Sequence, residues 1–122
     1  MKAAIELLFA EGTVIRRQMV NDFLQSKRLD GVPEALRQIA DASFPGGRQA
    51  DDLRGGLGGL AMPAQTVWGA TDRIIPPAHA EALPEAIGTH IIKDAGHMPH
   101  MEQAAQVNGL IQSLVRAAKE NG

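Results

Sequence analysis

The chain has 122 residues, with 12 lysines and arginines against 14 aspartates and glutamates, giving a net charge of -2. This balance gives no electrostatic reason to expect nucleic acid or an anionic membrane as a partner. No apolar run is long enough to span a bilayer, and the absence of cysteine excludes disulfides and thiolate zinc sites and favours a cytoplasmic protein.

Helices are expected in the first half of the chain, because apolar residues recur there at helical spacing. They are predicted over residues 3–10, 14–28 and 32–42. Gly12 ends the first helix, Thr13 is placed to cap the second, and Pro33 opens the third. The glycine-rich residues 52–60 match neither a dinucleotide-binding nor a phosphate-loop pattern, so we interpret them as a flexible connector.

Strand and helix alternate in the second half. Short apolar runs predict strands at residues 64–69 and 90–93, with a helix at 76–83 between them. A last helix is predicted over residues 99–119, with an apolar face made by Val107, Leu110, Ile111, Leu114, Val115 and Ala118. Gln65 interrupts the first strand and indicates an edge position or a hydrogen-bond partner elsewhere. The order strand–helix–strand–helix predicts an α/β fold.

A polar residue follows each predicted strand, Asp72 in WGATD and His97 in AGH. The carboxyl ends of parallel strands lie at one edge of a sheet, so these side chains are expected to meet. An acid beside a histidine orients the imidazole that activates a nucleophile. Each residue alone also suits an ordinary loop, and Arg73 is interpreted as a solvated neighbour of the acid.

The motifs WGATDRIIP and AGHMPHME resemble the C-terminal end of the α/β-hydrolase fold. The resemblance implies that Asp72 is the acid and His97 the base of a Ser-Asp-His triad, with Pro99 and Glu102 at the start of the closing helix. It also implies that residues 1–60 form a helical lid and connector over a core of residues 61–122. A plain helical surface layer would give the same pattern as a lid.

The triad order places the nucleophile before Asp72, yet no Gly-X-Ser-X-Gly motif occurs there. Ser26 and Ser43 lie upstream without a strand-and-turn setting. The chain is therefore either a fragment of a larger hydrolase-like protein or a whole protein that has lost the catalytic activity. A typical α/β domain often has about 200 residues or more, so we expect a C-terminal fragment.

His97, His100 and Glu102 lie close together in sequence and raise the question of a metal site. A turn residue and a residue that begins a helix point in different directions, and metal-binding helices favour histidine pairs at i, i+4. We therefore expect no metal site.

The helical segments before the first strand carry a more specific resemblance. They comprise residues 17–41, RQMVNDFLQSKRLDGVPEALRQIAD, and the GGRQ that follows. With the motifs above, they resemble the hydrolase-type part of the dihydrolipoyllysine acetyltransferase component of acetoin dehydrogenase complexes. This resemblance implies acetyl transfer between a dihydrolipoyl group and coenzyme A in the intact protein. The resemblance also implies two kinds of partner, namely the upstream half of the same hydrolase domain and the other components of the acetoin dehydrogenase complex. This chain alone is expected to bind no cofactor. A fragment of a general serine hydrolase or esterase, and a non-enzymatic module that forms homo-oligomers or binds partners, remain as alternatives.

Overall fold

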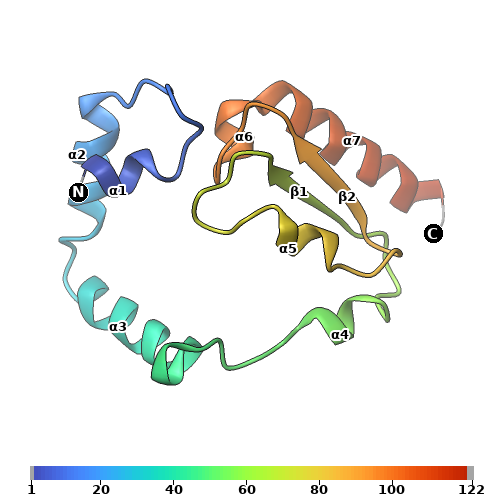
Figure 1. Ribbon diagram of the computed structural model, residues 1–122, viewed down its shortest axis with the longest axis horizontal. Coiled ribbons are helices and arrows are strands. Elements are labelled where there is room, and N and C mark those ends of the chain that lie inside the picture. Colours follow the sequence, from blue (N-terminus) through green and yellow to red (C-terminus); the bar gives the residue numbers. More distant parts are fainter. Residues whose placement is uncertain (1, 121–122) are drawn as a thin grey trace. The chain divides into compact units, whose positions relative to one another are not determined.

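The computed structural model describes residues 2–120, apart from the side chain of Lys2. In chain order the elements are α1 (Lys2–Glu6), α2 (Arg17–Ser26), α3 (Val32–Ser43), the 3-10 turn η1 (Pro45–Gly47), α4 (Arg54–Leu57), β1 (Gln65–Gly69), α5 (Ala78–Glu81), β2 (Gly88–Ile92), α6 (Pro99–Glu102) and α7 (Ala104–Glu120) (Figure 1). Strand and helix alternate from β1 onward, which confirms the α/β class. None of the helices in the described part combines the length and the apolar character that crossing a membrane requires.

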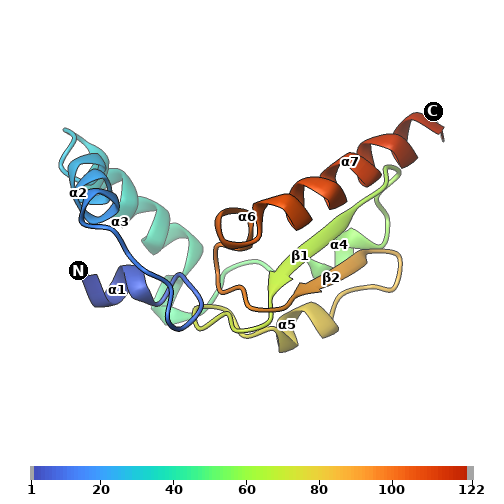
Figure 2. The same ribbon diagram turned by 90° about the horizontal axis from the view of Figure 1, so that it is seen from above.

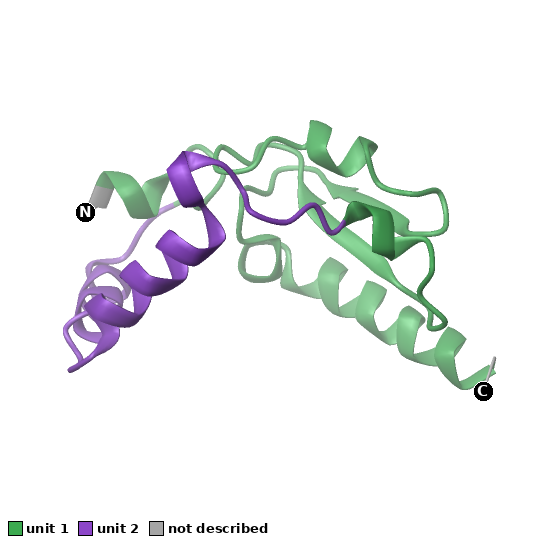
Figure 3. Ribbon diagram, turned by 90° about the horizontal axis from the view of Figure 1, so that it is seen from below, with its two compact units in different colours: residues 1–13, 54–122 green, residues 14–53 purple. Residues whose placement is uncertain are grey.

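The chain divides into two compact units, coloured in Figure 3. Unit 1 comprises Met1–Thr13 and Arg54–Gly122, and unit 2 comprises Val14–Leu53. These boundaries differ from the division at residue 60, and the assignment of residues 1–60 to a lid and connector stays a prediction.

Unit 1 is built around a two-stranded parallel sheet in which Gln65 lies opposite Gly88 and Gly69 opposite Ile92. Figure 2 shows α7 along one face of the sheet and α5 on the other. The buried apolar residues are Ile5, Phe9, Ala80, Ile87, Ile92, Ala95 and Val107. This core draws on both ends of the chain, because Ile5 and Phe9 join residues that follow β1.

The closing helix differs from the continuous helix predicted over residues 99–119. Gln103, with φ -130° and ψ 48°, separates the single turn α6 from α7, so that prediction was wrong. In α7, Val107 is buried whereas Ile111 and Val115 are exposed, so the rest of unit 1 covers only part of the apolar face.

The second predicted helix begins at Arg17 rather than residue 14. Arg16 occupies the cap position with extended backbone and no side-chain cap, so the capping role predicted for Thr13 was wrong. The Thr13 hydroxyl donates to Glu102 instead (3.3 Å). The third helix agrees with its prediction and follows Gly31, whose φ of 81° lies in the left-handed region. Neither α2 nor α3 contains a buried residue, so packing contributes little to the stability of unit 2.

The remaining short elements are close to prediction. The first helix ends at Glu6 rather than residue 10, and α5 is shorter than the predicted 76–83. The glycine-rich connector contains only the single turn α4. Gln65 is half-buried in a sheet whose described part has only two strands, so its amide is not enclosed in a core.

Candidate active site

Asp72 lies on the turn that follows β1, and hydrogen bonds join this turn to the loop that follows β2. The N–H and the hydroxyl of Thr71 both donate to the carbonyl oxygen of Ala95, each at 3.0 Å. The N–H of Ala70 donates to the carbonyl oxygen of Ile92 (2.9 Å). Hydrogen bonding thus continues past the strand ends and brings both loops to one edge of the sheet.

Asp72 and His97 form a hydrogen-bonded pair at this edge. The Nδ1 atom of His97 lies 2.9 Å from Oδ2 of Asp72, although the residues are 25 positions apart. The other carboxylate oxygen, Oδ1, accepts hydrogen bonds from the N–H groups of Ile74 (2.8 Å) and Ile75 (3.0 Å). These backbone bonds orient the carboxylate so that Oδ2 faces the imidazole. The structure therefore brings together the two side chains that the strand pattern placed at one edge.

Asp72 is buried but remains acidic. Burial, the largest influence, would raise the pKa of its carboxyl, yet the hydrogen bonds from His97 and from the N–H groups of Ile75 and Ile74 together hold the pKa below its ordinary value of 3.8. An ionised carboxylate can only accept hydrogen bonds, so Nδ1 of His97 carries a proton in this pair. In a neutral ring, Nε2 is then the nitrogen that can accept a proton.

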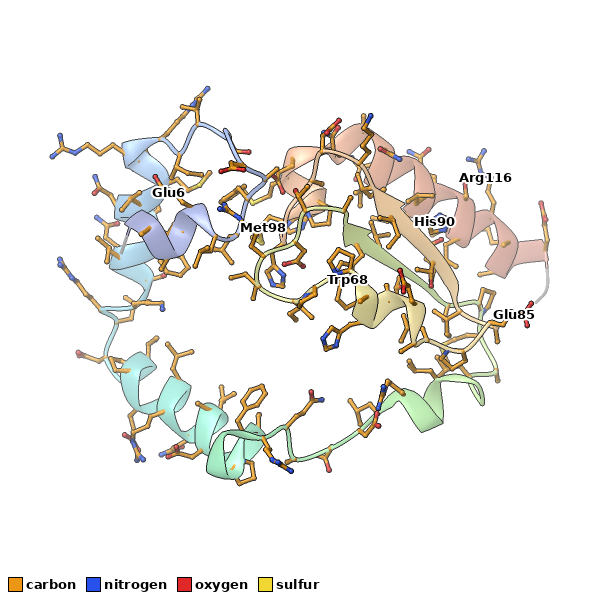
Figure 4. All side chains as sticks on the ribbon, in the orientation of Figure 1. Glu6, Trp68, Glu85, His90, Met98 and Arg116 are labelled. Carbon is orange, nitrogen blue, oxygen red and sulfur yellow. The ribbon has the colours of Figure 1, made fainter. Side chains whose placement is uncertain are left out.

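A cavity of about 150 Å³ adjoins the pair. It is lined by Val67, Trp68, Gly69, Asp72, Ile75, His97 and Pro99. The indole Nε1 of Trp68, labelled in Figure 4, donates to the carbonyl oxygen of Ile75 (2.9 Å), which fixes one wall. The His97 side chain is 31% exposed, and its only hydrogen bond to a described residue is the one through Nδ1. Its Nε2 is therefore available to a group entering from this side.

The Glu102 carboxylate, considered above as a metal ligand, accepts hydrogen bonds from backbone N–H groups. Its Oε2 accepts a hydrogen bond from the N–H of Gly96 (2.7 Å), and its Oε1 accepts one from the N–H of Ala10 (2.6 Å). His100 is exposed. Among the residues that the structure describes, no group of three or more His, Asp or Glu side chains could hold a metal ion.

Arg73 is exposed, in agreement with its interpretation as a solvated neighbour of Asp72, but it also contacts the N-terminal segment of unit 1. Its Nη2 donates to the carbonyl oxygens of Glu6 (2.5 Å) and Phe9 (3.0 Å). No local sequence signal predicts these contacts or those of Glu102 with Ala10, because the partners lie 64 to 92 positions apart.

Curated proteins with similar sequences share one name. The chain is 44% identical over 112 residues to the dihydrolipoyllysine-residue acetyltransferase component of the acetoin cleaving system of Cupriavidus necator. It is 47% identical over 116 residues to the protein of the same name from Pseudomonas putida. The matches cover 92% and 95% of this chain but 30% of each relative, so the chain spans less than a third of their length. No family model matches the sequence.

Solved structures with a similar backbone are hydrolases. A serine hydrolase involved in carbazole degradation, the CarC enzyme, matches 95% of this chain and 46% of its own with a TM-score of 0.81 at 18% identity. A thermophilic esterase from Thermogutta terrifontis matches 96% of this chain and 43% of its own with a TM-score of 0.66 at 28% identity. The chain carries part of an α/β-hydrolase fold. Within this α/β-hydrolase segment, unit 1 holds both loops of the Asp72–His97 pair. The predicted fold class and the resemblance to acetoin-system acetyltransferases are both confirmed.

Proposed function

We propose that this chain supplies the acid and the general base of an acyl-transfer centre, and that another part of the protein supplies the nucleophile. The observation that carries the proposal is the 2.9 Å contact between His97 Nδ1 and Asp72 Oδ2, with Nε2 left available beside a cavity. This arrangement has the acid and the base of a Ser-His-Asp triad in their usual relation.

Each residue has a defined role in the proposed reaction. His97 Nε2 takes the proton of the attacking hydroxyl as its oxygen bonds to the acyl carbon, and Asp72 stabilises the imidazolium that forms. His97 then returns this proton to the leaving thiol as the carbon–sulfur bond breaks. In the second half-reaction Nε2 takes the proton of the accepting thiol, whose sulfur bonds to the acyl carbon, and the proton passes to the released nucleophile oxygen.

We further propose that the acyl group is acetyl and that it passes between a dihydrolipoyl group and coenzyme A. This assignment is supported by the name of the curated relatives from Cupriavidus and Pseudomonas. The two groups supply the donor and acceptor thiols. The largely apolar cavity suits a short acyl thioester, whereas its lining includes no lysine or arginine for the phosphates of coenzyme A. We therefore assign no cavity residue to the nucleotide.

The proposed partners are the upstream half of the same hydrolase domain and the other components of an acetoin-cleaving complex. β1 pairs with β2 on one side only within the described sheet, which leaves backbone groups for a neighbouring strand of that upstream half. Such a strand would complete the α/β sheet and bring a nucleophile near the cavity.

A chimera tests the proposed reaction. This chain replaces the 116-residue matching segment of the Pseudomonas putida protein, and acetyl transfer from acetyl-dihydrolipoamide to coenzyme A is measured. We expect transfer by the chimera and a loss of about 10⁴-fold in kcat for Asp72→Asn or His97→Ala. The exposed His79 provides the matched control, so His79→Ala should retain activity. Retained transfer in His97→Ala would contradict the proposal.

Ester hydrolysis is the second candidate, because the Thermogutta protein is an esterase with 28% identity to this chain. The same chimera is assayed with p-nitrophenyl acetate and with longer esters, in the presence and absence of coenzyme A. Hydrolysis that is faster than thiol transfer at equal substrate concentration would favour this candidate.

A non-enzymatic module that assembles through its sheet edge is a third candidate. It is supported by the unpaired side of β1 and by the exposed Ile111 and Val115 on α7. Light scattering on the isolated chain tests it, and a strict monomer would count against it.

A further inference from the structure

The carboxylate of Glu102 joins three donors from two distant parts of unit 1. Its Oε2 binds the N–H of Gly96, the residue before His97, and its Oε1 binds the N–H of Ala10 and the hydroxyl of Thr13. Charge-assisted bonds of this kind are among the stronger hydrogen bonds in proteins. Glu102 thus ties the histidine loop to the segment before unit 2.

Arg73 ties the acid loop to the same segment. It follows Asp72, and its guanidinium donates to the carbonyl oxygens of Glu6 and Phe9. We call residues 5–13 the clasp segment, because its backbone binds Arg73 on one loop and Glu102 beside the other. Ile5 and Phe9 are buried, which anchors this segment in the core of unit 1.

The clasp segment also touches the histidine loop directly. A Cβ on Gly96 would lie 2.6 Å from both the backbone nitrogen of Ala10 and the carbonyl carbon of Phe9, closer than real contacts allow. The glycine therefore permits backbone-to-backbone packing one residue before His97. The position of this loop is set by the clasp segment as well as by β2.

Given the acyl-transfer role proposed for Asp72 and His97, we propose that Glu102 and Arg73 are positioning residues that hold the acid and histidine loops in register through the clasp segment. A displacement of about 1 Å in a catalytic group can cost on the order of 10²-fold in rate, so the relative position of the two loops affects the proposed chemistry. Neither side chain lines the cavity, so both act through the Asp72–His97 pair.

The first test uses this chain itself. The Nδ1 proton of His97 is followed by NMR in ¹⁵N-histidine-labelled protein, with circular dichroism and thermal unfolding on the same samples. Glu102→Gln keeps one acceptor oxygen of two and cannot hold Gly96 and Ala10 at their present positions, and Arg73→Met removes the guanidinium. We expect both variants to fold and to lose protection of the Nδ1 proton from exchange with water.

Glu85→Gln is the matched control, because Glu85 is exposed and lies at the other end of unit 1 from Glu6 and Met98 (Figure 4). It should keep the protected proton. A protected proton in Glu102→Gln or Arg73→Met equal to that of Glu85→Gln would overturn the proposal. Loss of protection only in step with global unfolding would also overturn it, since the role would then be structural.

The second test measures kinetics in the Pseudomonas chimera. Glu102→Gln should lower kcat by about 10- to 100-fold with KM nearly unchanged, because the binding cavity is left intact. A change confined to KM would overturn the positioning role. An inactive wild-type chimera would count against the acyl-transfer function alone, because the proton signal is measured without any reaction.

Discussion

Gly69, the last residue of β1, lies directly against the backbone of Gly96, the residue before His97. A Cβ on Gly69 would collide with the carbonyl oxygens of Ala95 and Gly96, which are backbone atoms and cannot rotate away. The loops of the acid and the histidine are thus in contact through a glycine at the strand end.

We expect Gly69→Ala to destabilise the protein by about 1–3 kcal/mol or more, because the methyl group would push the two loops apart. Urea unfolding followed by circular dichroism measures the change. Gly55→Ala is the control, since a Cβ there meets nothing within 4 Å and the residue lies in the helical turn α4. That control should be neutral or slightly stabilising. Equal stability of the two variants would show that the loops can separate without cost.

The lowered pKa of Asp72 predicts a pH-dependent stability. A carboxyl whose pKa is lower in the folded state stabilises that state above its unfolded pKa, and the contribution disappears as the pH falls through the folded pKa. The stabilisation that Asp72 gives relative to Asp72→Asn should therefore be present at about pH 5 and shrink as the pH falls below about 4. Urea titrations at several pH values provide the measurement, with the exposed Asp51→Asn as the control for removal of one charge. A difference that grows on acidification would contradict the assignment.

Asp94 has a φ of 57°, in the left-handed region that favours glycine. We expect Asp94→Gly to stabilise the protein by about 0.5 kcal/mol and Asp94→Ala to destabilise it, because alanine keeps the Cβ without a polar group that tolerates this backbone. Asp94→Asn should resemble wild type. Thermal unfolding of the three variants checks the order, and a more stable alanine variant would exclude backbone strain at this position.

Ile92 and Ile91 are adjacent in β2 but differ in exposure, at 1% and 46%. Ile92→Ala should cost about 2–5 kcal/mol because it leaves a cavity in the core of unit 1. Ile91→Ala should cost under about 1 kcal/mol. If Ile92→Ala does not fold, Ile92→Val should still lose about 0.5–1.5 kcal/mol. Similar losses of unfolding free energy at both positions would mean that Ile92 does not face the core of unit 1 while Ile91 faces solvent.

The strands and the meeting of Asp72 with His97 could be predicted because they depend on local patterns and one general rule. Short apolar runs that end in a polar residue indicate strands, and parallel strands bring their carboxyl ends to one edge. The sequence-based bounds of β1 were within one residue of those observed.

The contacts of Arg73, Thr13 and Glu102 could not be predicted in the same way. Thr13 has a good capping residue type, yet Glu102 competes for its hydroxyl from 89 positions away. The helix break at Gln103 directly follows Glu102, and the Nε2 of Gln103 donates to the carbonyl oxygen of Asp94 (3.4 Å). Local propensity contains no information about partners at such separations, so tertiary contacts overrode it.

Unit 2 lies between Thr13 and Arg54 in the chain. Among the residues that the structure describes, the side chains of Asp72 and His97 form hydrogen bonds only with residues of unit 1. Residues 14–53 can therefore change in length and composition between descendants of one ancestor while the Asp72–His97 pair is inherited unaltered.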